Sequence, residues 1–115
     1  KFIGYHSLLL RDTRLDGSFI VVPITTLTTF LSDKIRSRNV DLIKVDVEGA
    51  EQMVLNGAEF VMQKIRSWII EVHGTNNRLI EMKNLLHSYG YKTRWLDRDH
   101  IYAWRGKHSQ LTDCA

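Results

Sequence analysis

The chain of 115 residues contains a single cysteine, Cys114. One cysteine can form neither an internal disulfide bond nor a cysteine-based zinc site, which fits a reducing compartment, so we expect a cytoplasmic protein. No apolar run approaches the roughly 18 residues that would suggest a membrane span. No basic segment followed by an apolar one opens the chain, as it would in a signal peptide. The sequence therefore predicts no membrane association.

Clustered positive charge is also missing. The formal net charge is +3, but Lys and Arg are spread along the sequence, which is typical of solvated surfaces. A nucleic-acid surface needs basic residues on one face, interleaved with exposed aromatic residues. We therefore expect no nucleic-acid partner. The aromatic residues fall instead in runs that suit buried strands: Trp68, Tyr91, Trp95, Tyr102 and Trp104.

Short apolar runs alternate with stretches of helical periodicity between residues 18 and 104. Because the link at 97–99 is polar and short, the last two strands should form an antiparallel hairpin. The alternation of strands and helices before it predicts a single α/β domain with a parallel sheet. Residues 1–17 and 106–115 are expected to be loop or tail. Strands are predicted at five runs: 19–22, 42–47, 68–72, 91–96 and 100–104.

The run at 42–47 is nearly all apolar and β-branched, which predicts a central strand covered on both faces. A helix should follow it, and Gly57 predicts a kink or a break into two short helices. The spacing of small and apolar residues predicts the inner face of this helical stretch: Ala50, Val54, Ala58, Val61 and Ile65.

Acidic residues and a histidine follow two predicted strands at the point where each strand ends. Asp46 and Glu48 lie at the end of the first buried strand, and Glu71 and His73 at the end of the next. Ligands of open parallel sheets bind at this carboxyl edge. A general base needs an acceptor atom near the substrate proton and a pKa tuned by its neighbours. These residues are therefore candidates for a catalytic rim.

Simpler roles exist for the same residues. Glu48 and Glu51 can each cap the helix that follows them, and His73 can satisfy backbone groups in a tight turn. Asp46 is harder to explain structurally, since its strand otherwise reads as buried and an unpaired buried carboxylate is costly. Asp, Glu and His also bind magnesium, manganese or zinc. The spacing matches no dedicated metal motif, so we expect no metal site.

A series of motifs resembles the FkbM-type S-adenosylmethionine-dependent methyltransferases. The most specific is the run Leu42-Ile-Lys-Val-Asp-Val-Glu-Gly-Ala-Glu51 with Ile69-Ile-Glu-Val-His73 downstream. The likeness covers about residues 18–104. It continues through shorter matches: Val22-Pro-Ile-Thr-Thr-Leu27, Met53-Val-Leu-Asn-Gly-Ala58, Gly90-Tyr91 and His100-Ile101.

The resemblance implies the C-terminal half of a Rossmann-like, three-layer methyltransferase fold, with parallel strands that end in an antiparallel hairpin. Family members build most of their cofactor site from an N-terminal half with a glycine-rich turn, and this sequence contains no such turn. They also commonly carry Thr-Leu-Asp where this chain has Thr26-Leu27-Thr28. Any role of the family's aspartate therefore cannot be assigned to Thr28. Residues 1–115 would then be a partial domain that is inactive alone.

By the same resemblance, the intact enzyme moves a methyl group from S-adenosylmethionine to a hydroxyl of a sugar or another small natural-product acceptor. Asp46, Val47 and Glu48 are then expected to line the cofactor site. The catalytic residues are expected among Asp46, Glu48 and His73, any of which is a candidate base. The alternative is a catalytically silent module that completes its sheet with a partner or a second copy, because bare strand edges invite pairing.

Overall fold

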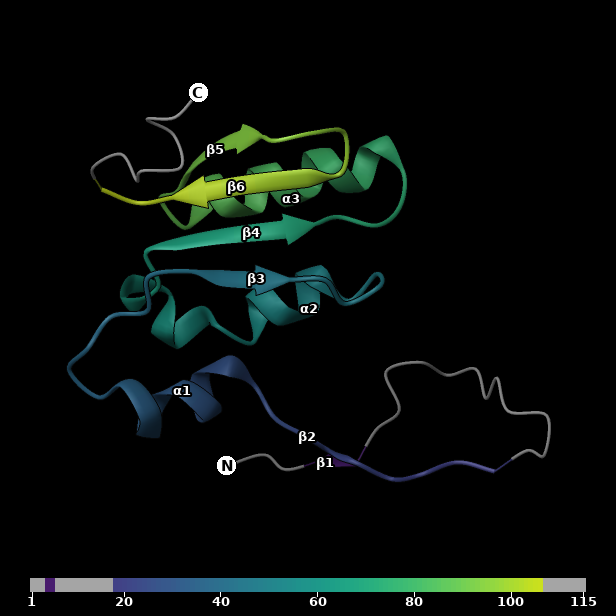
Figure 1. Cartoon of the computed structure of the whole chain (residues 1–115), viewed down its shortest axis with the longest axis vertical. Coiled ribbons are helices and arrows are strands. Elements are labelled where there is room, and N and C mark those ends of the chain that lie inside the picture. The colour runs from purple at the N-terminus through teal and green to yellow at the C-terminus, as the bar shows by residue number, and fades with distance from the viewer. Residues whose placement is uncertain (1–3, 6–17, 107–115) are drawn as a thin grey trace.

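The computed structural model describes residues 4–5 and 18–106 (Figure 1). Within these residues, no helix is long and apolar enough to cross a lipid bilayer. A four-stranded mixed sheet has the spatial order β3-β4-β6-β5. Its strands are β3 (Ile43–Val45), β4 (Ser67–Glu71), β5 (Lys92–Trp95) and β6 (His100–Trp104). A separate antiparallel pair joins β1 (Gly4–Tyr5) to β2 (Pro23–Ile24).

The central pairing of the sheet confirms two predictions. β3 and β4 run parallel, with Val45 opposite Ile70. Their connection holds α2 (Glu51–Asn56) and the 3-10 helix η1 (Glu59–Lys64), and such a crossover is what parallel neighbours require. β6 lies between β4 and β5 and is antiparallel to both, which confirms the predicted hairpin. Gly57 separates α2 from η1, so the predicted break is also confirmed.

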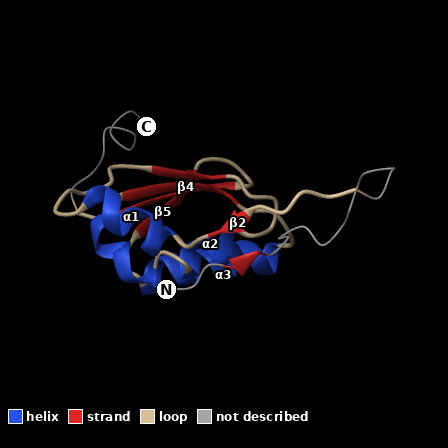
Figure 2. Ribbon diagram, turned by 90° about the horizontal axis from the view of Figure 1, so that it is seen from below, coloured by secondary structure: helices blue, strands red, loops and turns tan. Residues whose placement is uncertain are grey.

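The helices lie on one side of the sheet (Figure 2). α3 (Asn76–Ser88) connects β4 to β5, and α1 (Leu27–Ile35) precedes β3 and packs against η1. Thr26 caps α1 by accepting a hydrogen bond from the backbone N of Thr29. The described part of the chain thus has two layers, one fewer than the three-layer expectation. The sheet and the helices share one core, which includes Val45, Trp68, Ile70, Ile101, Leu55, Met62, Met82 and Leu86.

The prediction of a strand at residues 19–22 is wrong. These residues form no strand and are exposed, and only Pro23–Ile24 pairs, with Gly4–Tyr5. β-branched side chains favour extended backbone, but a strand also needs a partner for its backbone hydrogen bonds. The pairing of Gly4–Tyr5 also contradicts the loop expected there. Residues 1–3, 6–17 and 107–115 lie outside the described residues.

β3 is shorter than predicted and lies at an edge of the sheet. It spans Ile43–Val45, and no strand in the described ranges pairs with its outer side. Lys44 and Leu42 are exposed, so the expectation of a central strand covered on both faces is wrong for this part of the chain. The apolar run correctly reports a preference for extended backbone. It carries no information about how many neighbours the strand has.

Candidate functional site

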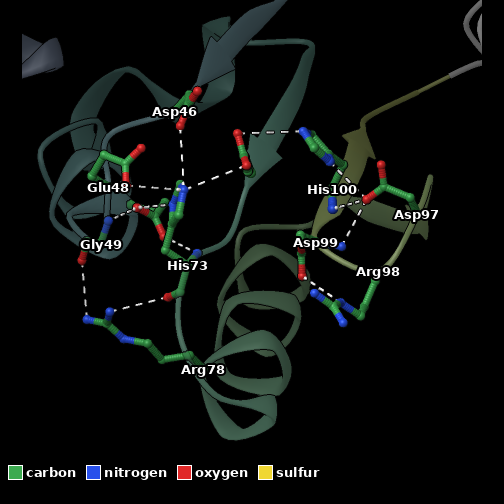
Figure 3. A network of polar contacts seen from close by, with 11 residues as sticks. Asp46, Glu48, Gly49, His73, Arg78, Asp97, Arg98, Asp99 and His100 are labelled. Carbon is green, nitrogen blue, oxygen red and sulfur yellow. Dashed lines mark hydrogen bonds and ion pairs between the residues drawn. The ribbon is translucent and has the colours of Figure 1, made fainter.

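Two parallel strand ends bring the predicted residues to one rim of the sheet (Figure 3). β3 ends at Val45, directly before Asp46, and β4 ends at Glu71, shortly before His73. Because the two strands are parallel and in register, both ends meet at the same edge. Side-chain atoms of Asp46, Glu48 and His73 lie within 4.8 Å of one another. The structure therefore brings the three residues together, while their catalytic and cofactor roles stay predictions.

The Nε2 atom of His73 is the centre of this rim. It lies 3.7 Å from Asp46 Oδ1, 3.7 Å from Glu48 Oε2 and 3.7 Å from Glu71 Oε1. These separations exceed hydrogen-bond distance, so each carboxylate acts on the imidazole through its charge. The side chain of His73 is 28% exposed, whereas that of Asp46 is 46% exposed. Asp46 is therefore not buried as expected, because it lies just beyond the end of β3.

Glu51, the first residue of α2, contacts the rim residues from the buried side. Its side chain is only 3% exposed. Its Oε1 atom accepts a hydrogen bond from the backbone N of His73 at 2.8 Å, and its Oε2 atom accepts one from the backbone N of Gly49 at 2.6 Å. Oε2 also lies 3.5 Å from His73 Nδ1. One carboxylate thus joins the turn after β3 to the end of β4 and faces the imidazole ring.

Sequence reasoning gave Glu51 no role beyond a helix cap. It placed Ala50 and Val54 on the inner face of α2, but both are only half-buried. The remaining predicted positions are buried: Ala58, Val61 and Ile65. Within α2, however, the buried residues are Glu51 and Leu55, whose spacing is equally helical. Choosing Leu55 as the inward position would have placed Glu51 inside. The protein tolerates this buried carboxylate because two backbone N–H groups satisfy it.

The turn after β3 has an unusual backbone that orients Glu48. Glu48 has φ 52° and Gly49 has φ 102°, both in the region that favours glycine. This bend carries the Glu48 side chain back over His73 (Figure 3). Arg78 of α3 then fastens the two loops, donating from Nη1 to the His73 carbonyl at 3.3 Å and from Nη2 to the Gly49 carbonyl at 3.2 Å.

Substituting Gly74→Ala should loosen this Arg78 clamp. Gly74 has φ 128°, and a Cβ added there would collide with Arg78 Cδ. We expect the free energy of unfolding to fall by about 1–3 kcal/mol in urea denaturation, as is typical of strained backbone. Gly106→Ala is the matched control, because Gly106 also has a positive φ but its added Cβ meets nothing within 4 Å. Equal losses in the two variants would contradict a specific effect on Arg78.

Carboxylates around His73 control its protonation. Burial alone would lower the pKa of His73, but the negative charges of Glu48, Glu51 and Glu71 outweigh burial, and the pKa is raised above its ordinary value. His73 therefore keeps its proton to a higher pH than an ordinary histidine does, and it is available as a base above its raised pKa.

A second histidine lies on the same rim. His100 Nδ1 is 2.8 Å from Asp97 Oδ1, and His100 Nε2 is 3.7 Å from Glu71 Oε2. The hydrogen bond to His100 is the largest reason why the pKa of Asp97 lies below its ordinary value, and a bond from the backbone N of Asp99 adds to it. Glu71 thus lies between two imidazoles. Sequence reasoning treated Asp97 and Asp99 only as parts of a hairpin link.

The chemistry of the rim suits a cationic ligand. Carboxylate and imidazole atoms of this kind bind divalent cations, and the same negative charge attracts sulfonium or ammonium groups. A hollow between α2 and α3, beside Glu51 and Arg78, has an empty volume of about 240 Å³. This volume includes open solvent, and the enclosed part has room for little more than a water molecule. The carboxylate and imidazole groups thus fit a positively charged cofactor, but this hollow alone does not enclose one.

Comparison of the sequence with known protein families identifies the family of this chain. The family model described as methyltransferase FkbM domain matches residues 5–93. The chain belongs to the FkbM methyltransferase family. The matched region contains both strand ends and stops before β6. No curated protein and no solved structure matches the chain.

The predicted cofactor residues of this FkbM methyltransferase domain lie in one exposed loop. Asp46, Val47 and Glu48 follow β3 directly, and all three are exposed. Their side chains are therefore accessible to a ligand without any rearrangement of the core. The FkbM match associates the loop and the rim around it with methyl-transfer chemistry.

Proposed function

We propose that this chain carries the acceptor side of an S-adenosylmethionine-dependent O-methyltransferase. The observation that supports this most directly is the position of His73, whose Nε2 atom faces three carboxylates at the ends of β3 and β4. In this proposal the acceptor is a hydroxyl group of a sugar or of another small natural product. Asp46, Val47 and Glu48 lie on the cofactor side of the rim, and His73 is the general base.

When bound, S-adenosylmethionine would supply an electrophilic methyl group, with the sulfur–methyl bond breaking and S-adenosylhomocysteine leaving. His73 Nε2 takes the proton of the acceptor hydroxyl as the oxygen of that hydroxyl becomes methylated. The imidazolium that forms is stabilised by Glu48, Glu51 and Glu71, the same charges that raise the pKa of His73. Direct displacement depends mainly on alignment of the reacting groups. Arg78 contributes to alignment by holding the loops after β3 and β4 together.

The negative charge of the rim also bears on whether the acceptor is charged or neutral. Carboxylates of Asp46, Glu48, Glu51 and Glu71 all lie within 3.7 Å of a ring nitrogen of His73. Within the described chain, the hydrogen bonds of the Arg78 guanidinium go to backbone carbonyls of the two loops rather than to these carboxylates. An acceptor that carries phosphate or carboxylate would meet like charge here. Neutral hydroxyl compounds are therefore the acceptors that we propose.

We place most contacts to the cofactor on a glycine-rich half that this sequence does not contain. The outer edge of β3 pairs with no strand of the described residues, and such an edge can accept a further strand. We propose that a strand of the cofactor half, or of a second copy, adds at this edge. The strand ends of both halves would then line one common crevice.

Replacing His73 with glutamine should lower kcat for methyl transfer about 100-fold and leave KM nearly unchanged, because the variant keeps a polar side chain but loses the base. The assay follows transfer of a labelled methyl group from S-adenosylmethionine to a panel of neutral sugars. The protein for this assay is expressed from its complete natural gene. The wild-type rate should rise with pH through the raised pKa of His73, since only the neutral imidazole accepts a proton.

His100→Gln is the matched control for this experiment. His100 has a similar exposure, 32% against 28%, and its Nε2 atom also lies 3.7 Å from Glu71, but it is not part of the cluster with Asp46 and Glu48. We expect its kcat to stay within a few-fold of wild type. Equal losses in the two variants, or full activity without His73, would refute the assignment of the base.

A further inference from the structure

Among the rim carboxylates, Glu51 differs from the other three by its burial. The side chains of Asp46, Glu48 and Glu71 are 46%, 74% and 30% exposed, whereas that of Glu51 is 3% exposed. Glu51 also lies on the opposite side of the imidazole ring, because it faces Nδ1 while the others face Nε2. Its two backbone hydrogen bonds hold it in this place.

Carboxylates face both ring nitrogens of a neutral His73, but those near Nε2 are 30–74% exposed to screening water, whereas Glu51 beside Nδ1 is only 3% exposed. Nδ1 is buried and has no hydrogen bond within ordinary geometric limits, and Glu51 Oε2 lies 3.5 Å away. Both oxygens of Glu51 already act as acceptors, as expected of an ionised carboxylate. An unprotonated Nδ1 would place its lone pair against this carboxylate in a region that water does not reach. A protonated Nδ1 needs only a small rotation of the ring to donate to Oε2.

We propose that Glu51 is a positioning residue that keeps the proton of neutral His73 on Nδ1 and leaves the Nε2 lone pair directed at the acceptor. The inference rests on the proposed function of His73 as base. The nitrogen that carries the proton is generally set by the partner of the other ring nitrogen. Loss of an orienting carboxylate can lower kcat by up to about 10⁴-fold in a histidine-based site, because the ring then adopts the wrong tautomer.

The tautomer can be measured without substrate or cofactor. Long-range proton–nitrogen NMR spectra of the ¹⁵N-labelled chain, recorded above the pKa of His73, distinguish a protonated Nδ1 from a protonated Nε2. The His73→Gln variant assigns the signals, and EDTA in the sample removes any metal that could bind Nε2 and fix the same tautomer. We expect wild-type His73 to be protonated on Nδ1. A proton on Nε2 in the wild-type chain overturns the proposal, even if no variant folds.

Two isosteric variants complete the test. Glu51→Gln should move the proton of His73 substantially toward Nε2, because the amide no longer offers a charged acceptor. Glu48→Gln is the matched control, since Glu48 also lies within 3.7 Å of the ring but faces Nε2 and is largely exposed. It should leave the tautomer on Nδ1. Equal effects of the two variants, or none in Glu51→Gln, contradict a specific role of Glu51.

Failure of this inference is distinguishable from failure of the proposed function. If His73 is not the base, His73→Gln keeps its methyl-transfer activity while the tautomer result can still stand. If His73 is the base but Glu51 does not position it, His73→Gln loses activity while Glu51→Gln retains the wild-type tautomer. If Glu51→Gln does not fold, Glu51→Asp keeps the charge but withdraws it from Nδ1, and the same shift toward Nε2 is expected.

Discussion

S-adenosylmethionine should bind the purified chain with a dissociation constant in the millimolar range or weaker. The described rim offers acidic side chains that are mostly exposed, and each screened attraction to the sulfonium or ammonium group contributes only about 1 kcal/mol. Micromolar binding requires roughly 8 kcal/mol. The hollow beside Glu51, at about 240 Å³, adds little enclosure. Titration calorimetry on the purified chain measures the constant directly.

A matched titration tests the source of the residual affinity. S-adenosylhomocysteine lacks the sulfonium charge, so it should bind more weakly still if attraction to the rim is the main contribution. Asp46→Asn should likewise weaken the binding of S-adenosylmethionine. A micromolar constant for the monomeric chain would contradict our placement of the cofactor contacts outside this sequence.

Replacing Trp68 with alanine should lower the free energy of unfolding by about 3–5 kcal/mol, the usual cost of removing a large buried aromatic side chain. Trp68 is fully buried in β4, where it lies opposite Ala103 of β6 and opposite Ile43 of β3. Small domains are stable by only about 5–15 kcal/mol in total, so much of their stability would disappear. Urea denaturation followed by circular dichroism gives the value.

Phe60→Ala is the control for the Trp68 experiment. Phe60 is also aromatic, but its side chain is on the surface of η1, and the residue is 83% exposed. Its replacement should change stability by no more than about 0.5 kcal/mol. A loss below 1 kcal/mol for Trp68→Ala would show that the core between the sheet and the helices is not packed as described.

Local patterns predicted the elements that local interactions determine. The short link at 97–99 favours a hairpin, and the break between α2 and η1 lies at Gly57, the residue with the lowest helix propensity in that stretch. The rim was also predictable, because parallel strands in register must end at the same edge and Asp46, Glu48 and His73 follow those ends. The FkbM resemblance was confirmed by the family match.

The errors arise where the outcome depends on distant parts of the chain. An apolar run such as 19–22 becomes a strand only if another backbone pairs with it, and its own residues do not specify that partner. The edge position of β3 has the same origin. Glu51 is a different case, because its burial depends on the helical face that packs inward. Val54 and Leu55 are both apolar and adjacent in sequence, and in the folded chain the helical face that contains Leu55 and Glu51 is the buried one.

The position of β6 affects the order in which the strands of the sheet can pair while the chain is being synthesised. β6 is the last strand along the described chain, yet it lies between β4 and β5, and β5 has no other partner within the sheet. A nascent chain therefore leaves one side of β4 unpaired until Trp104 has emerged from the ribosome. Unpaired strand edges are the sites where incomplete domains associate wrongly. His100 arrives with the same strand, so the sheet closes and the rim gains its second imidazole in a single late step.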